Sequence, residues 1–502
     1  MKLGIDFGTT RIVVAAVDRG NYPILSFETP EGQADWLPPL VALRGAERRF
    51  GWTAWAVQGE PGWTLVRSLK RVLGEAGAET SVDVDGASHS LLDLLTGMAA
   101  EVRSALQIAG PLETMLGVPA NASSAQRFLT VEAFRRAGFE VLGLLNEPSA
   151  AAIEFGHSQK LTGRLLVYDL GGGTFDASLV DLDREVHTVV ATEGIAGLGG
   201  DDFDQALAEL ATGGAAFDGY SAGELFRLLE ECRRQKEALH PNTRRIVVDL
   251  DQAREGQGQA TVPAAAFYER CRPLVEETIQ KVSGLLGDGE AAVLYVTGGG
   301  SELPLVARLL RERFGRRVRR SAYTRGATAI GLAIQADAAS GYTLRDVFSR
   351  NFGVWREGHE GREKLFDVIF ASGTRLPAPG TAPLAAARQY RPAHNVGHFR
   401  YLEASQVDGA GRPTGDISVW DEVWFPFDPA FRVESDLALA QVRRSDAVAG
   451  QEIEERYAVS AAGTLAVTIE NLTARYEREY TLGRRAAPAT PVPVPGRKRR
   501  AR

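Results

Sequence analysis

Two stretches of the chain repeat one pattern, in which an apolar run, an aspartate and a glycine-containing turn lead into a second apolar run. The first is Gly-Ile-Asp-Phe-Gly-Thr-Thr-Arg-Ile-Val-Val-Ala-Ala-Val at residues 4–17. The second is Leu-Leu-Val-Tyr-Asp-Leu-Gly-Gly-Gly-Thr-Phe-Asp-Ala-Ser-Leu-Val at residues 165–180. Short apolar runs bounded by turn residues are typical of buried strands. Each stretch is therefore predicted to be a β-hairpin, and the repetition indicates two similar subdomains that face each other across a cleft.

The turn of the second hairpin has a composition suited to phosphate. Gly171, Gly172 and Gly173 have no Cβ, so their backbone N–H groups can converge on an anion. Asp169 and Asp176 flank this turn, and carboxylates beside a phosphate fit a divalent cation between them. An ordinary hairpin with a loose glycine loop is the alternative, and the repeated pattern favours a nucleotide site. Neither copy is a P-loop, and neither opens a helix as a dinucleotide-binding fingerprint does.

Predicted strands and helices alternate over roughly the first two thirds of the chain, which is the pattern of an α/β protein. Apolar spacing of three and four residues predicts helices at 65–73, 91–108, 126–137, 225–239, 303–314 and 327–338. Uninterrupted apolar runs predict strands at 115–118, 141–145 and 293–297. Glu147 stands at a strand-to-helix turn, and Gly199 with Gly200 precedes a helix, where backbone N–H groups can face an anion.

The pattern changes after Ser340 and Gly341. From Phe352 onward helical periodicity is largely replaced by prolines and by alternation of apolar and polar residues, which predicts an all-β unit. The predicted organisation is an α/β domain at 1–338, a linker at 339–350, a β-domain at 351–483 and a tail at 484–502. The tail spaces prolines among arginines and is predicted to be disordered.

Composition narrows the function classes only slightly. With 502 residues, 44% hydrophobic and 24% charged, the chain is in the ordinary range of soluble globular proteins. The formal charge of -7 gives no basis for membrane binding, nor for nucleic-acid binding outside the basic tail. Cys232 and Cys271 belong to no metal or redox motif and are expected to be half-buried helix residues. Without a long apolar run or a leader segment, the protein is expected to be cytoplasmic.

Four motifs resemble those of the seventy-kilodalton heat-shock chaperones, the DnaK-like family. They occur in order at residues 4–10, 146–152, 169–176 and 198–204. The resemblance is strong over about the first two thirds of the chain and weak over 346–482. It implies an α/β fold in which an actin-like, two-lobed ATPase domain is followed by a β-sandwich-like substrate-binding domain. No helical segment is predicted after Leu482, so the resemblance implies a truncated form that lacks the family's helical lid.

The resemblance also implies site residues, position by position. Lys70 matches the family's catalytic lysine and would offset charge on the γ-phosphoryl oxygens. Glu147, Asp169, Thr174 and Asp176 would orient the attacking water and the metal-bound waters, and any of these three carboxylates can accept the proton of the water. Mg²⁺ would be held mainly through water by Asp6, Asp169 and Asp176. The implied nucleotide contacts are Asp6, Gly8, Thr9, Thr10, Gly171, Gly172, Gly173, Gly199, Gly200, Lys236, Gly298 and Gly299.

Other positions have two further roles. Some concern communication between the domains, and others concern contact with the base of the nucleotide. Pro119 and Arg127 match the residues with which the family relays nucleotide state, and Asp346 matches the aspartate of its linker. Residues 356–364 are predicted to be a densely charged loop where the family is apolar, so a leucine-preferring groove is not expected. At the base site the family's glutamate, arginine, serine, serine and arginine are replaced, which predicts weaker nucleotide binding. The replacing residues are Arg233, Glu237, His240, Gly300 and Glu302.

The leading hypothesis from the sequence is an ATP-dependent chaperone that hydrolyses ATP and couples hydrolysis to binding of unfolded or specific protein segments. Its expected cofactors are ATP and Mg²⁺, with K⁺ as a further candidate, and its expected partners are protein clients and a co-chaperone or nucleotide-exchange factor. One alternative is a nucleotide-dependent adaptor whose β-domain binds a single fixed partner. The other is a small-molecule kinase of the actin-like superfamily, which ranks lower because Lys70 with Glu147 fits attack by water.

Overall fold

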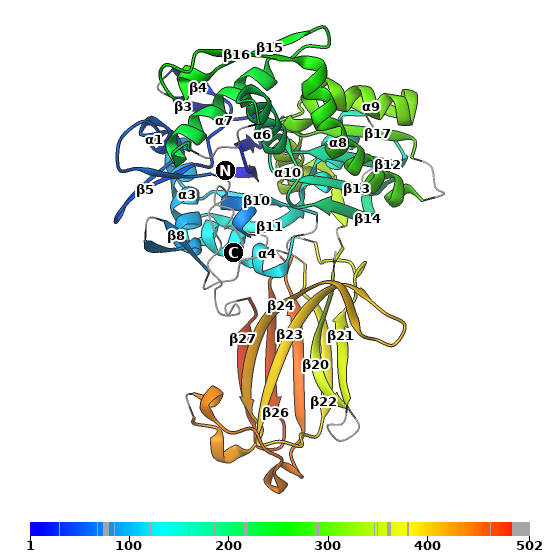
Figure 1. The fold of residues 1–502 in the computed structure, drawn as a ribbon. Helices are drawn as coiled ribbons and strands as arrows, with labels where there is room; N and C mark the ends of the chain where they lie inside the picture. Colours follow the sequence, from blue (N-terminus) through cyan, green and yellow to red (C-terminus); the bar gives the residue numbers. More distant parts are fainter. Residues whose placement is uncertain are drawn as a thin grey trace.

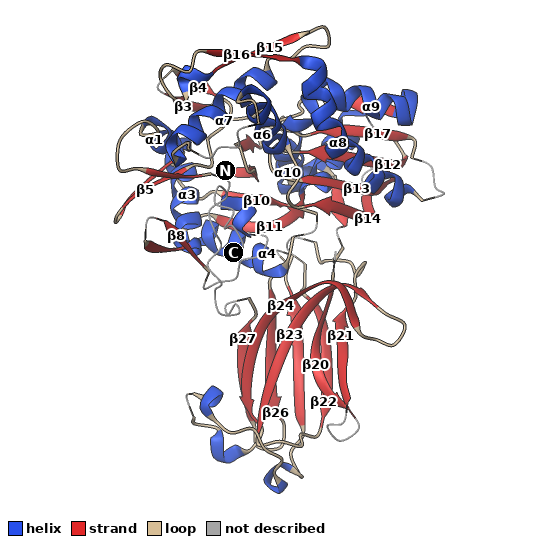
Figure 2. Ribbon diagram, in the orientation of Figure 1, coloured by secondary structure: helices blue, strands red, loops and turns tan. Residues whose placement is uncertain are grey.

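The computed structural model describes residues 1–29, 31–67, 69–73, 80–84, 86–120, 122–159, 161–183, 186–214, 219–287, 291–345, 347–348, 350–358, 363–378, 381–434, 436–461 and 463–483. Two α/β lobes lie side by side, and a separate β-sandwich lies below them (Figure 1). Helices are concentrated in the lobes, whereas the sandwich consists almost entirely of strands (Figure 2). None of the described helices is long and apolar enough to cross a membrane.

The first lobe is built on a four-stranded sheet in the order β11-β10-β1-β2. β1 and β2 form an antiparallel hairpin, and β10 and β11 extend the sheet in parallel. Helices α3 and α4 share one hydrophobic core with this sheet, and each begins at a serine that accepts a hydrogen bond from the first turn. The elements of this lobe are β1 (Lys2–Phe7), β2 (Ile12–Ala16), β3 (Phe27–Thr29), β4 (Gly32–Ala34), β5 (Val41–Arg44), β6 (Glu47–Phe50), α1 (Gly51–Ala56), β7 (Thr64–Val66), α2 (Leu69–Val72), β8 (Ser81–Val84), β9 (Ala87–Ser90), α3 (Leu91–Leu106), β10 (Glu113–Val118), α4 (Ser124–Arg136) and β11 (Glu140–Asn146).

The second lobe repeats this topology. Its six-stranded sheet has the order β18-β17-β12-β13-β14-β19, in which the antiparallel hairpin β12–β13 is followed outward by parallel β17 and β18. This order corresponds to β11-β10-β1-β2, so the predicted internal repeat is confirmed. The elements are α5 (Glu147–Gln159), β12 (Gly163–Leu170), β13 (Phe175–Asp183), β14 (Val186–Ile195), α6 (Gly200–Ala211), α7 (Ala222–Glu237), β15 (Arg245–Asp249), β16 (Gln259–Pro263), α8 (Ala264–Leu286), β17 (Val293–Thr297), α9 (Pro304–Phe314), β18 (Val318–Arg320), α10 (Ala327–Ala336) and β19 (Thr343–Arg345).

Helices α5 and α10 cross between the lobes. A Cβ on Gly331 of α10 would lie 1.8 Å from the carbonyl oxygen of Ala150 in α5, and a Cβ on Gly4 of β1 would lie 2.3 Å from the carbonyl oxygen of Ala329. Only glycine allows backbones to approach this closely. The small-residue composition of α10 is thus explained by its position, pressed between the first sheet and α5.

The β-domain is a sandwich of two four-stranded antiparallel sheets, β21-β20-β23-β24 and β22-β25-β26-β27. Aromatic and aliphatic side chains of both sheets form one core, as the predicted alternation requires. The strands are β20 (Asn351–Gly358), β21 (Glu363–Phe370), β22 (Leu384–Tyr390), β23 (Val396–Val407), β24 (Pro413–Pro426), β25 (Ile453–Val459), β26 (Leu465–Asn471) and β27 (Tyr476–Thr481).

The segment between the lobes and the sandwich is not a free linker. β19 pairs in parallel with β14 and so adds an edge strand to the sheet of the second lobe. Leu344 of β19 is buried, and its N–H donates to the Gln335 side chain at 3.2 Å. The ring of Tyr342 contacts the rings of His157 and His187 at centroid distances of 5.4 and 5.6 Å. The chain therefore leaves the second lobe through a docked strand.

The structure corrects three expectations about local structure. The predicted helix at 65–73 is wrong in its first part, because Val66 pairs with Val41 in the sheet β6-β5-β7 and the helix α2 begins at Leu69. The charged residues of 356–364 do not form one long loop, since the first three end β20 and the last two begin β21, with 359–362 outside the described residues. Cys232 and Cys271 are fully buried, because they point into the apolar core of the second lobe.

Candidate nucleotide site

A cavity lies between the two hairpins, where the lobes face each other. Its walls come from both hairpin turns, from α2, α6 and α7, and from the glycine turn after β17. Most of the residues predicted for the site line this cavity, although they are far apart in sequence. They are Asp6, Gly8, Thr9, Thr10, Lys70, Glu147, Asp169, Gly171, Gly172, Thr174, Gly200, Lys236, Gly298 and Gly299.

Of the remaining predicted residues, Gly199 and Asp176 lie directly behind the cavity wall. A Cβ on Gly199 would lie 2.5 Å from the carbonyl oxygen of Gly172, so glycine is required for the approach of the two segments. The N–H groups of Gly200 and Asp201 donate to Gly171 and Gly172 at 2.9 and 2.7 Å, which ties the N-terminus of α6 to the hairpin turn. Gly173 belongs to the same turn, between β12 and β13.

A buried ion pair stands on one side of the cavity. Nζ of Lys70, on the short helix α2, donates to Oε1 of Glu147, the first residue of α5, and both side chains are at most 10% exposed. Burial lowers the pKa of Lys70, but the charges of Glu147 and Asp6 outweigh burial, so the net pKa is raised and the ammonium stays charged. A permanent cation is thereby fixed at the edge of the glycine turns.

Three aspartates crowd the same region. Burial and the charge of Glu147 raise the pKa of Asp6 to about 7 and that of Asp176 to about 7. The pKa of Asp169 is raised well above its usual value by burial and by its carboxylate neighbours. Asp176 also accepts a hydrogen bond from the N–H of Ala120 at 2.9 Å. One lysine cannot balance four carboxylates, so the donor set fits a hydrated divalent cation.

The fit to such a cation is indirect. Within the described ranges, no group of three or more His, Cys, Asp or Glu side chains is arranged to hold a metal ion directly. Mg²⁺ retains several waters in many nucleotide sites, and those waters can bridge to carboxylates. Asp6, Asp169 and Asp176 would therefore hold Mg²⁺ mainly through water, as the resemblance implies.

The crowding predicts a pH dependence of stability. An unfolded chain releases the protons of Asp6 and Asp176 near pH 4, whereas the folded chain keeps them up to about pH 7. Unfolding therefore releases protons between these values, and the free energy of unfolding from this source falls as the pH rises to about 7 and levels off above it. Because Mg²⁺ competes with those protons, we expect it to raise the Tm more at pH 8 than at pH 6, measured at constant ionic strength. Equal shifts of the Tm at both pH values would contradict the assignment of these aspartates to a Mg²⁺ site.

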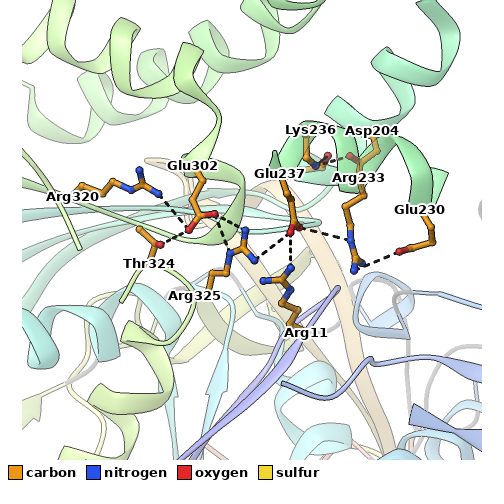
Figure 3. A network of polar contacts seen from close by, with 11 residues as sticks. Arg11, Asp204, Glu230, Arg233, Lys236, Glu237, Glu302, Arg320, Thr324 and Arg325 are labelled. Atoms are coloured by element: carbon orange, nitrogen blue, oxygen red, sulfur yellow. Dashed lines mark hydrogen bonds and ion pairs between the residues drawn. The ribbon is translucent and has the colours of Figure 1, made fainter. Parts of the chain in front are cut away.

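Farther along the cavity, arginine and glutamate side chains form a continuous network (Figure 3). Glu237 of α7 lies 2.7 Å from Arg11 of the first lobe and 3.2 Å from Arg325, and Arg325 lies 2.6 Å from Glu302. Arg233 lies 3.8 Å from Glu237. Nearby, Lys236 contacts Asp204 at 2.7 Å and donates to the carbonyl oxygen of Gly200 at 2.6 Å. Three of the five replacements predicted at the base site, Arg233, Glu237 and Glu302, thus belong to one charge-paired network.

Two of the residues predicted to relay nucleotide state lie between the cavity and the β-domain. Pro119 directly precedes Ala120, whose N–H donates to Asp176, and Arg127 of α4 donates to Oδ1 of Asn146 at 2.6 Å. A Cβ on Gly463, in the turn between β25 and β26, would lie 3.4 Å from Cδ of Arg127. Contacts therefore run from the carboxylates through the first lobe to the sandwich. Asp346, the third predicted relay residue, lies outside the described residues.

Comparison with known proteins decides the family. A family model described as Hsp70 protein matches residues 92–360, which is more than half of the chain. The chain belongs to the Hsp70 family. The match begins after Asp6 and Lys70. The place of the first hairpin and of Lys70 in the site therefore rests on the geometry described above.

Alignments with individual Hsp70-family relatives extend over more of this chain than the family model does. The Chaperone protein HscA homolog of Bordetella pertussis is 32% identical over 424 residues, which cover 78% of this chain and 66% of the relative. Chaperone protein HscA of Klebsiella pneumoniae is 34% identical over 427 residues, with the same two shares. The chain thus spans 66% of the length of the relatives that it matches.

Several cavity residues were not predicted from the sequence. Arg11 directly follows the first Thr-Thr pair, and Asp201 and Asp204 follow the predicted glycines of α6. Thr324 and Arg325 precede the small-residue helix α10. The sequence did contain a signal for Arg325. Glu237 and Glu302 stand where the family carries arginine, and two such glutamates indicate a cation nearby.

Proposed function

We propose that this Hsp70-family protein binds ATP with Mg²⁺ between its lobes, hydrolyses it, and couples hydrolysis to binding of protein segments by the β-sandwich. The observation that carries the proposal is the buried pair of Lys70 and Glu147 beside three crowded aspartates and two glycine-bearing hairpin turns. Cations and hydrogen-bond donors that are fixed before the reaction are what phosphoryl transfer to water requires.

Different residues of the cavity have different roles in hydrolysis. The N–H of Gly171 donates to the carbonyl oxygen of Thr174 within the turn, so the backbone N–H of Gly172 is the one that holds phosphate oxygens there, with Thr9 and Thr10 lining the same cavity. Lys70 offsets the charge that develops on the transferred group, and it stays protonated because carboxylates surround it. Bound Mg²⁺ neutralises phosphate charge when present.

Several carboxylates can orient the attacking water. Glu147 is held by Lys70, and Asp176 is held by Ala120, so both have fixed positions. Asp169 has a strongly raised pKa because it is buried among carboxylates, and such a group can accept a proton near neutral pH. Thr174 hydrogen-bonds Asp176 and lines the cavity, which fits a role in positioning.

The kinase alternative differs in its acceptor. A kinase needs a substrate hydroxyl near its catalytic base, whereas the proposed site needs only water. ATP turnover without any acceptor separates the two, because a kinase would be nearly silent under these conditions. Sustained release of phosphate supports the proposal, and turnover that appears only with a small-molecule acceptor would replace it.

We propose that ATP hydrolysis and binding of protein segments are coupled through the docked strand β19 and through the contact of Arg127 with the sandwich. We expect Leu344→Asp to detach β19, because a carboxylate at a buried position costs several kcal/mol. The variant should bind nucleotide, yet client peptides should no longer change its ATPase rate. Leu344→Val is the matched control and should respond to peptide like the parent. An unchanged peptide response in Leu344→Asp would show that β19 does not carry the coupling.

The client is proposed to be a protein segment, and one observation favours a specific partner. Near the hairpin of β20 and β21, one ion pair reaches the sandwich interior, since half-buried Arg356 contacts fully buried Glu455 at 2.8 Å and half-buried Asp367 at 2.7 Å. A charged interior at this position is better suited to one specific partner, as in a nucleotide-dependent adaptor, than to many different apolar segments. A peptide array distinguishes the two forms, because a general chaperone binds many apolar segments and an adaptor binds few. A co-chaperone or exchange factor, K⁺ and a cytoplasmic location stay predictions.

A further inference from the structure

The guanidinium of Arg325 is held flat at the cavity wall. Glu302 accepts hydrogen bonds from its Nε at 3.1 Å and from one terminal nitrogen at 2.6 Å, while Glu237 lies 3.2 Å from the other terminal nitrogen (Figure 3). The carboxylates thus hold the edges of the guanidinium plane. The side chain is 34% exposed, so its faces are only partly covered.

Glu302 is itself fixed. Oγ1 of Thr324 donates to one of its oxygens at 2.6 Å, and Arg320 lies 3.3 Å from the same oxygen. Its pKa is lowered, because hydrogen bonds from Arg325 and Thr324 outweigh the effect of burial, so the carboxylate is charged near neutral pH. Arg325 is therefore oriented before any ligand arrives.

The position of Arg325 relates it to the base of a nucleotide. In the turn after β17, a Cβ on Gly298 would lie 2.4 Å from Oδ1 of Asp169, whereas a Cβ on Gly299 would lie 3.8 Å from Cγ of Arg325. The turn thus leads from the carboxylate end of the cavity to Arg325. With phosphates at the carboxylate end, the base of the nucleotide occupies the end at Arg325.

We propose that the nucleotide base stacks on the guanidinium face of Arg325 and that Glu302 is the positioning residue for this contact. A planar, weakly hydrated guanidinium stacks well on aromatic rings and on bases. The other two cavity arginines are less suited, because Arg11 and Arg233 lie over the ring of Trp36 at 4.9 and 5.7 Å. The proposal rests on the nucleotide binding proposed above.

The test compares ATP with inorganic tripolyphosphate, which lacks the base and the ribose. We expect Arg325→Ala to weaken ATP binding about tenfold and to leave tripolyphosphate binding unchanged. Arg325→Lys keeps the charge but loses the flat face, so it should resemble Arg325→Ala. Arg270→Ala is the matched control, because Arg270 also pairs with a glutamate, Glu209, at 2.7 Å but contacts neither Glu302 nor the cavity, and it should bind ATP within about twofold of the parent.

A double-mutant cycle tests the positioning role of Glu302. Glu302→Gln should lower the ratio of ATP to tripolyphosphate affinity at an unchanged Tm, and adding Arg325→Ala should have little further effect. The proposal is overturned if Arg325→Ala or Arg325→Lys binds ATP like the parent, or if Arg325→Ala weakens tripolyphosphate equally. Failure of the proposed function looks different, because the parent itself would then bind no ATP.

Discussion

Replacing Lys70 by alanine should reduce ATP hydrolysis by at least a hundredfold while ATP binding is largely retained. Lys70 is the cation fixed beside the glycine turns, and removing one preorganised donor from a transition state typically costs about 3 kcal/mol or more. The variant also leaves Glu147 buried without this partner, which increases the negative charge that faces the phosphates. Single-turnover hydrolysis and equilibrium ATP titration measure the two effects separately.

Lys281→Ala is the control for this variant. Lys281 also pairs with a glutamate, Glu193, at 3.1 Å, but both side chains are 44% exposed on the surface of the second lobe. Exposed pairs contribute little, so hydrolysis and Tm should stay close to those of the parent. Near-normal hydrolysis by Lys70→Ala would remove the lysine from the mechanism, and loss of ATP binding would assign it to binding instead.

Replacing Glu455 by alanine should destabilise the β-sandwich by about 3 to 5 kcal/mol, because it breaks a buried ion pair. The Glu455 side chain is fully buried and accepts hydrogen bonds from both terminal nitrogens of Arg356, at 3.0 and 2.8 Å, and from the hydroxyl of Tyr457. Arg356 belongs to one sheet and Glu455 to the other, so the pair joins the two layers. Calorimetry should show the transition of the β-domain lowered by on the order of 10 °C.

Glu454→Ala on the same strand is the matched control. Glu454 pairs with Arg456 at 2.6 Å, but the Arg456 side chain is 42% exposed, so the change should cost at most about 1 kcal/mol. The transition of the two α/β lobes should stay unchanged in both variants. If Glu455→Ala and Glu454→Ala melt alike, the buried pair does not stabilise the sandwich.

The sequence predicts the hairpins and the glycine turns well, because their signals are local. Glycine runs, an aspartate at a strand end and short apolar strands are each visible within about ten residues. Pairings over long distances are not visible in this way. Lys70 and Glu147 are 77 residues apart, and only the resemblance brought them together before the structure did.

Other features had weak or conflicting local signals. β19 has only three residues, and its place beside β14 depends on the packing of Leu344 and Tyr342 rather than on a strand pattern. Residues 65 and 66 belong to a stretch with helix-like apolar spacing, yet their pairing with β5 overrides it. The network around Arg325 depends on compensation between charges from four separate segments, which contain Arg11, Glu237, Glu302 and Arg325, and no single stretch reveals it.

The central claim is that water attacks ATP in the cavity between the lobes. The most direct test is hydrolysis in ¹⁸O-labelled water, with Mg²⁺ and no acceptor, followed by mass spectrometry of the phosphate released. We predict that each released phosphate carries one oxygen from water and that Lys70→Ala releases at least a hundredfold less. Bound ATP that stays intact in the parent chain, or phosphate that appears only with an acceptor, would contradict the account.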